Sequence, residues 1–187
     1  MTTNSAKTTD PIVTAAIHRI AATRFPNSQT GEIAAYECTM TLPKQFKDDA
    51  AKANKLFKRI QSDFCKSVLR GTGTTPRYVA IRANNAKRPE FRFALFTPAN
   101  AQLDQPEEYS EHGRAIANHK ASQMGWTCEN MDIVEILMDS CTFKIVHEPL
   151  RIRDDSRHEA LKSLEEHLGD KAASVNGQRS VFVSKAS

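Results

Sequence analysis

Apolar residues recur along this chain at two spacings, which separate its expected helices from its expected strands. Between residues 48 and 70 the spacing is three or four, which is typical of a helix with one buried side. The apolar side of that helix consists of Ala53, Leu56, Phe57, Ile60, Phe64, Val68 and Leu69. Between residues 32 and 42 apolar and polar residues alternate, which indicates a half-buried strand.

The remaining elements follow from weaker patterns and from residues that start or end helices. Asp10 before Pro11 is a typical helix start, and Gly169 is a typical helix end. Further helices are expected over residues 11–26, 110–124 and 154–169. Further strands are expected over residues 132–138, 142–147 and 180–184. The first of these strands could equally be helical, because a short apolar run fits both states.

Two alternating segments on either side of a polar turn predict a hairpin over residues 76–96. If Ile81 lies opposite Phe93, one face of the hairpin is apolar and packs on the helices. That face carries Val79, Ile81, Ala83, Phe91, Phe93 and Leu95. The other face carries Tyr78, Ala80, Arg82, Glu90, Arg92, Ala94 and Phe96. This second face mixes guanidinium and aromatic groups, as a ligand-binding sheet surface would.

From residue 32 onward the expected order is strand, helix, strand, strand, helix, strand. This order predicts an α+β fold with the ferredoxin-like split βαβ arrangement, in which an antiparallel sheet carries its helices on one face. A C-terminal strand, helix and strand are added to it. After a flexible tail over residues 1–9, one domain is expected over residues 10–187. It would comprise an N-terminal helix and loop, the ferredoxin-like core and a C-terminal extension, over residues 10–31, 32–140 and 141–187.

Composition narrows the class of protein without identifying its partner. A hydrophobic content of 40% in 187 residues is enough for a folded core. The net charge of +4 permits contact with nucleic acid or with an acidic protein and requires neither. The four cysteines form no CxxC pair, which predicts free thiols in the reducing cytoplasm. The chain has no run of about 18 apolar residues, so no membrane partner is expected.

The arginines of the hairpin are the first candidate site. Arg82 and Arg92 would be cross-strand neighbours, and like charges opposite one another destabilise a sheet unless an anion lies between them. A phosphate could bridge the two guanidinium groups while bases stack on the rings of Tyr78 and Phe96. The competing interpretation is an internal network in which a carboxylate such as Glu90 supplies the negative charge.

A basic stripe on the long helix is the second candidate site. It consists of Lys55, Arg59 and Lys66, and Lys87 and Arg88 at the hairpin tip would extend the same basic surface. Such a surface can bind phosphates with salt-dependent affinity. More often, however, a basic helix face is simply solvated.

No motif predicts catalysis, a metal site or a cofactor. The chain lacks the nucleophile elbow of hydrolases and both glycine-rich nucleotide-binding motifs. His112 and His119 share an expected helix but stand seven residues apart, about 10 Å along its axis, which is too far for one metal ion. We therefore expect no catalytic residue and no cofactor.

Roughly residues 32–124 carry the features of a known family. They contain a strand, a long basic helix, the R-Y-V-x-x-R strand that begins at Arg77, a turn, and the x-F-x-F-A-L-F strand that ends at Phe96. This order resembles the replication-initiator domains of the rolling-circle group in filamentous phages and small plasmids. In that family two histidines of the last strand hold a divalent metal, and a later tyrosine attacks the scissile phosphate.

In this chain Glu90 and Arg92 stand at the positions of the two histidines, and Tyr109 is the tyrosine that fits by position. Arginine has no acceptor and stays protonated, so it cannot bind a metal. The resemblance therefore implies a phosphate-binding scaffold without nuclease chemistry.

These observations lead to one main expectation about function and two alternatives. We expect a non-catalytic nucleic-acid-binding protein of a phage or plasmid, with single-stranded DNA or RNA as its partner. The first alternative is an inhibitor, regulator or adaptor that binds a host protein through the same sheet face or through the edge strand at residues 180–184. The second alternative is a divergent metal-dependent nicking protein.

Overall fold

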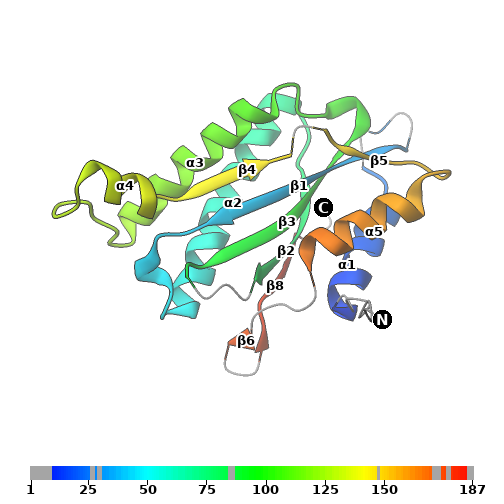
Figure 1. Cartoon of the computed structure of the whole chain (residues 1–187). Coiled ribbons are helices and arrows are strands. Elements are labelled where there is room, and N and C mark those ends of the chain that lie inside the picture. The colour runs from blue at the N-terminus through cyan, green and yellow to red at the C-terminus, as the bar shows by residue number, and fades with distance from the viewer. Residues whose placement is uncertain are drawn as a thin grey trace, which may run out of the picture.

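The computed structural model describes residues 10–25, 28, 31–83, 87–146, 148–169, 174–175 and 178–184. The tail expected over residues 1–9 and the turn at residues 84–86 lie outside the described residues. The described part is built around an antiparallel sheet flanked by helices (Figure 1). Within it, no helix combines the length and the apolar character that crossing a bilayer requires.

The sheet has the strand order β4-β1-β3-β2-β8, and β5 also pairs with β1. All of these pairings are antiparallel. The strands are β1 (Ile33–Thr41), β2 (Arg77–Ala83), β3 (Glu90–Pro98), β4 (Thr142–Ile145), β5 (Leu150–Ile152) and β8 (Val181–Val183). A separate ribbon is formed by β6 (Ser174–Val175) and β7 (Gln178–Arg179).

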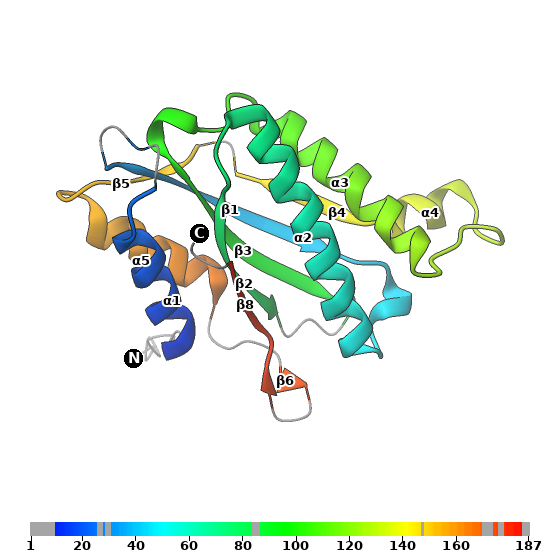
Figure 2. The ribbon, with the colours of Figure 1, turned by 180° about the vertical axis from the view of Figure 1, so that it is seen from behind.

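The helices cover both faces of the sheet. They are α1 (Pro11–Ala22), α2 (Ala50–Thr72), α3 (Pro106–Gln123), α4 (Ile133–Asp139) and α5 (Arg157–Leu168). Two short 3-10 turns are η1 (Lys44–Phe46) and η2 (Ala99–Ala101). Figures 1 and 2 show α2 and α3 on one face and α1 and α5 on the other, with α4 projecting beyond the end of α3.

The predicted α+β class with an antiparallel sheet is confirmed. β3 lies between β1 and β2, which α2 connects, so the strands have the order of a split β-α-β unit. The two core helices share one face, as expected. The second face is covered by α1 and α5, more completely than the sequence indicated. The segment 132–138, whose pattern fits both states, is not a strand: Asp132 caps the helix α4, which covers Ile133–Asp139.

Helix α2 forms where the three- and four-residue spacing predicted it. The Asp49 side chain accepts a hydrogen bond from the backbone N–H of Lys52 at 2.8 Å, which caps the first turn. Gly73 ends the helix with a φ of 71°, a conformation that glycine adopts without strain. On the buried side of α2, Phe57 stacks on Phe91 with ring centroids 4.4 Å apart. The opposite side is exposed and carries the lysines.

The central strands bury side chains on both faces, in two separate apolar clusters. The cluster under α2 and α3 includes Tyr36, Cys38, Phe91, Phe93 and Leu95. The cluster under α1 and α5 includes Ala35, Val79, Ile81, Ala94 and Phe96. Because both faces are apolar, alternation alone does not decide which side chains of β2 and β3 share a face.

The expected register of the hairpin is wrong by one residue. Ile81 pairs with Arg92, and Arg82 pairs with Phe91. A shift of one residue sends every side chain of one strand to the other face, since successive side chains alternate. Arg82 therefore lies on the face covered by α2, and Arg92 lies on the face covered by α5.

Helix α3 approaches β4 closely at Gly113, which yields a test of the packing. A Cβ at this position would lie 2.6 Å from the ring of Phe143, and that ring is itself held against Phe64 and Phe93. We expect Gly113→Ala to lower the free energy of unfolding by about 1 to 2 kcal/mol, because overpacking outweighs the better helix propensity of alanine. Urea denaturation measures the change. The control is Arg114→Ala at the exposed neighbouring position, which should leave the free energy of unfolding nearly unchanged. A Gly113→Ala variant with a higher free energy of unfolding than the wild type would contradict this packing.

Candidate functional site

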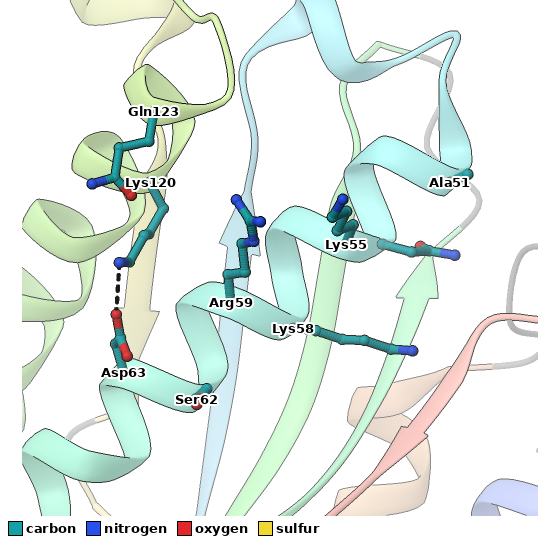
Figure 3. Close-up of a pocket in the computed structure, with 9 residues that line it drawn as sticks. Ala51, Lys55, Lys58, Arg59, Ser62, Asp63, Lys120 and Gln123 are labelled. Carbon is teal, nitrogen blue, oxygen red and sulfur yellow. Dashed lines mark ion pairs between the residues drawn. The ribbon is translucent and has the colours of Figure 1, made fainter.

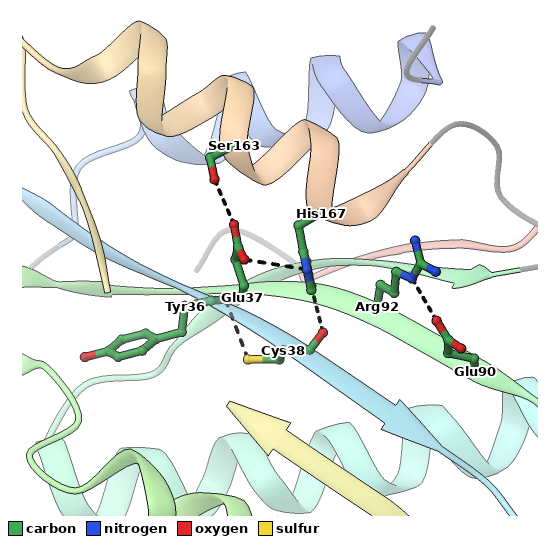
Figure 4. A network of polar contacts seen from close by, with 7 residues as sticks. All are labelled: Tyr36, Glu37, Cys38, Glu90, Arg92, Ser163 and His167. Atoms are coloured by element: carbon green, nitrogen blue, oxygen red, sulfur yellow. Dashed lines mark hydrogen bonds and ion pairs between the residues drawn. The ribbon is translucent and has the colours of Figure 1, made fainter. Parts of the chain in front are cut away.

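Arg92 belongs to an internal ion pair and not to a pair of arginines. Its Nε donates to Oε1 of Glu90 at 2.8 Å; the Glu90 side chain is 15% exposed and that of Arg92 is 40% exposed (Figure 4). The guanidinium also lies against the end of α5, where a Cβ on Gly169 would be 3.1 Å from Arg92 Nη1. The competing interpretation of the sequence, an internal arginine–carboxylate network, therefore describes Arg92 correctly.

A second polar group ties α5 to β1 on the same face. The Ser163 hydroxyl donates to Oε1 of Glu37 at 2.9 Å, and His167 Nδ1 lies 3.7 Å from Oε2 of Glu37 (Figure 4). His167 Nε2 lies 3.0 Å from the backbone oxygen of Cys38, which can only accept, so this nitrogen carries the hydrogen. These contacts satisfy the polar groups beneath α5 and fix its position on the sheet.

The four residues proposed for the sheet surface are thus separated. Phe96 is fully buried in the cluster under α1 and α5. Tyr78 packs on the opposite face, half-buried beside α2. Arg82 shares that face, and its Nη1 is buried without a hydrogen-bond partner among the described residues. Burial lowers the pKa of the Arg82 guanidinium. The surface on which Arg82 and Arg92 would jointly bind a phosphate does not exist.

The residues at the positions of the catalytic residues of replication initiators are also separated in the structure. Tyr109 lies on α3, with its hydroxyl close to Gly71 of α2. Glu90 and Arg92 lie on the other side of the sheet and bind each other. Within the described part of the chain, no group of three or more His, Cys, Asp and Glu side chains is arranged to hold a metal ion. Tyr109 is therefore not placed to act with Glu90 in nicking.

The predicted basic stripe does line an open groove. The groove has a volume of about 540 Å³ and lies between the exposed side of α2 and the last turns of α3 (Figure 3). Its charged lining consists of Lys55, Lys58, Arg59, Lys120 and Asp63. The uncharged lining consists of Ala51, Asn54, Ser62 and Gln123. Four cations therefore face one carboxylate.

The single carboxylate of the groove is neutralised by lysines from two helices. Asp63 Oδ2 lies 2.8 Å from Nζ of Lys120, and its Oδ1 lies 3.1 Å from Nζ of Lys66. Hydrogen bonds from Lys120, and to a lesser extent from Lys66, hold the pKa of Asp63 below its usual range, so the carboxylate stays ionised and paired. Lys55 and Arg59 form no ion pair with any described residue. Their charges are available to a ligand.

A smaller hollow continues the groove along α2. It has a volume of about 340 Å³ and shares Lys58 and Ser62 with the groove. Its lining also includes Lys66 and Tyr78. The two hollows together form a basic track along the exposed side of α2, and the lining of the second includes one aromatic residue, Tyr78 of β2. We call this surface the α2 track.

Some of these residues were missed from the sequence. Lys58 is near the predicted stripe of Lys55, Arg59 and Lys66 in the sequence but was not assigned to the site. Lys120 comes from α3, and its position beside Asp63 depends on how the two helices pack. The contacts of Glu37 with α5 also join residues more than 120 positions apart, and no local pattern indicates them.

The two cations expected at the hairpin tip, Lys87 and Arg88, differ in their exposure and contacts. Lys87 is exposed. Arg88, in contrast, is half-buried, and its guanidinium donates to backbone oxygens. Its Nε donates to the oxygen of Leu42 at 2.9 Å, and its Nη1 and Nη2 donate to the oxygens of Met138, Asp139 and Ser140 at 2.5 to 3.3 Å. This arginine clamps the C-terminal end of α4 to the hairpin.

Comparison of the chain with protein-family models, with curated proteins and with solved structures finds no match. The function proposed below therefore rests on the chain's own residues.

The clamp gives a prediction for Arg88. Arg88→Ala leaves the last carbonyls of α4 without these donors, and we expect it to lower the free energy of unfolding by about 2 kcal/mol. Hydrogen exchange should speed up over residues 133–141, and urea denaturation measures the loss. Binding of an oligonucleotide to the folded variant should not change. A variant of unchanged stability that loses oligonucleotide binding would restore the phosphate role.

The thiols give a second prediction, because burial disfavours thiolate formation. It raises the pKa values of Cys65 and Cys141 to about 12, and that of Cys38 well above its usual value. At pH 8 these three groups stay protonated and should react slowly with a disulfide reagent. We expect one fast thiol in the folded protein, removed by Cys128→Ser, and four in denaturant. Fast reaction of any thiol in the folded Cys128→Ser variant would contradict this.

Proposed function

We propose that the protein is a non-catalytic nucleic-acid-binding protein that holds the phosphate backbone of a single strand on the α2 track. A phage or plasmid origin is proposed from the resemblance to replication initiators. The observation that carries the proposal is the groove in which Lys55, Lys58 and Arg59 line a surface whose one carboxylate, Asp63, is already paired with Lys120 and Lys66. The surface differs from the one expected from the sequence, but it includes Lys55, Arg59, Lys66 and Tyr78 from that expectation.

The geometry of the track suits a flexible polyanion. Lys55 and Arg59 are one helical turn apart, and the hollows continue along α2 past Lys58 to Lys66. A row of cations of this kind contacts successive phosphates and releases their counterions, which is the main source of affinity in non-specific binding. The groove is open to solvent, so a strand can enter it from the side and the protein need not change its conformation.

Sequence preference is expected to be weak. Contacts with phosphates position a nucleic acid but do not read its bases. The ring of Tyr78 in the lining of the track offers a stacking surface to an unpaired base, which favours a single strand over a duplex. Since Phe96 is buried under α1 and α5, the second ring that the sequence suggested takes no part.

Fluorescence anisotropy with a labelled oligothymidylate tests this proposal. We expect Lys55→Gln/Arg59→Gln to weaken binding roughly tenfold at low salt, because two phosphate contacts are lost. With about four phosphates bound, the slope of log affinity against log salt should be about −3 for the wild type and about half of that for the variant. The matched control is Arg19→Gln/Lys162→Gln, which removes two exposed cations from α1 and α5.

The control should leave affinity nearly unchanged. Equal weakening by both double variants would show that only the net charge matters, and the α2 track would be rejected as a site. Failure of the wild type to bind the oligonucleotide at low salt would reject nucleic-acid binding altogether.

A further inference from the structure

The short helix α4 exposes an apolar side that nothing in the described structure covers. Four of its seven residues are large aliphatic or Met side chains that face solvent. Their exposed fractions are 77% for Ile133, 67% for Val134, 69% for Leu137 and 73% for Met138. Positions i, i+1, i+4 and i+5 lie on one side of a helix, so these side chains form a single stripe. Figures 1 and 2 show this helix at the extremity of the molecule.

The helix that carries the exposed stripe is anchored at both ends by hydrogen bonds. Asp132 and Glu135 form a capping box at the start of α4, in which each side chain accepts from the backbone N–H of the other. At the far end, Asp139 accepts from Trp126 Nε1 at 3.2 Å and from the backbone N–H of Lys44 at 2.7 Å. Arg88 completes this end with its bonds to the last carbonyls. A helix so restrained loses little conformational entropy when it binds.

The segments outside the described residues contain few apolar side chains that could cover the stripe. The segments outside the described residues contain Met1 as their only large aliphatic or Met side chain. A stripe of this kind on a soluble helix is the usual anchor for a groove in another molecule.

Charge decides which molecule fits. Three acidic residues, Glu129, Asp132 and Glu135, are exposed before or within the first turn of α4. Of the cations at its other end, Arg88 is directed at the carbonyls of the helix, and the exposed Lys44 contacts Asp139 through its backbone N–H. The start of the stripe is therefore acidic. Two copies of the chain meeting through α4 would bring like charges together, which opposes a symmetric dimer. An anionic membrane would repel the same carboxylates, and surface-binding helices normally carry Lys and Arg instead.

We infer that α4 is a docking helix that inserts Ile133, Val134, Leu137 and Met138 into an apolar groove of a second protein whose rim carries Lys or Arg. The site lies apart from the α2 track and does not depend on nucleic-acid binding. The sequence allowed an adaptor that binds a host protein through the sheet face or the edge strand. The stripe on α4 offers such an adaptor a different surface.

Site-specific photocrosslinking in the full-length chain tests the inference. A photoreactive residue is placed at Leu137 and, as a matched control, at Ile12, an exposed aliphatic residue of α1. The protein crosslinked from position 137 only is then purified and titrated with the unlabelled chain. We expect Ile133→Ser/Leu137→Ser to weaken that binding roughly tenfold or more, and Ile12→Ser to leave it unchanged. Binding should also weaken with salt and with replacement of basic rim residues in the partner by Glu.

Each other outcome overturns the inference. Crosslinks at position 137 that join two copies of the chain, with a dimer in sedimentation that Ile133→Ser/Leu137→Ser abolishes, would identify α4 as a self-association surface. Binding to phosphatidylcholine/phosphatidylglycerol vesicles that the same variant abolishes would identify a membrane contact. Equal crosslinking from positions 12 and 137 would show that the stripe has no specific partner. Both substituted residues face solvent, so the variant should keep its circular dichroism spectrum and its affinity for the oligonucleotide, which separates this test from that of the α2 track.

Discussion

The pairing of β1 with β3 is the constraint on which the rest of the structure depends. These two central strands bury side chains on both faces, with Tyr36, Phe91 and Phe93 under α2 and α3 and with Ala35 and Phe96 under α1 and α5. A sheet that is apolar on both sides must be covered on both sides, because exposed apolar area of this size would be unfavourable in water. The central part of the sheet is therefore covered on both faces, whereas Thr142 and Lys144 of the edge strand β4 are exposed.

The elements of the fold could be predicted from the sequence, whereas the faces of the hairpin could not. Helix α2 shows its buried side in its spacing, and the order of strands and helices indicated the α+β class. The segment Phe91–Phe96 is apolar or aromatic at almost every position, so alternation gave no reason to prefer one register over the next. Because the observed register differs from the expected one by one residue, Arg82 and Arg92 lie on opposite faces of the sheet and cannot share a site.

The roles of the charged residues do not follow from local sequence, because they depend on distant partners. Arg88 looked like any exposed cation at a turn, yet its partners are backbone oxygens about 50 residues away. Lys55 and Arg59 were identified because a helix stripe is a local property. The stripe on α4 was visible as a pattern in residues 133–138, but only the tertiary arrangement shows that it faces solvent.

The Arg88 clamp connects the orientation of α4 to the completion of the hairpin. Its donors belong to the loop before β3, and its acceptors lie at the end of a helix that follows α3. Arg88 precedes these acceptors by about 50 residues, so the clamp forms only after α4 has been synthesised. The apolar stripe thus acquires its final direction only when both segments are present. A partner that requires this direction would distinguish the mature protein from its incomplete forms.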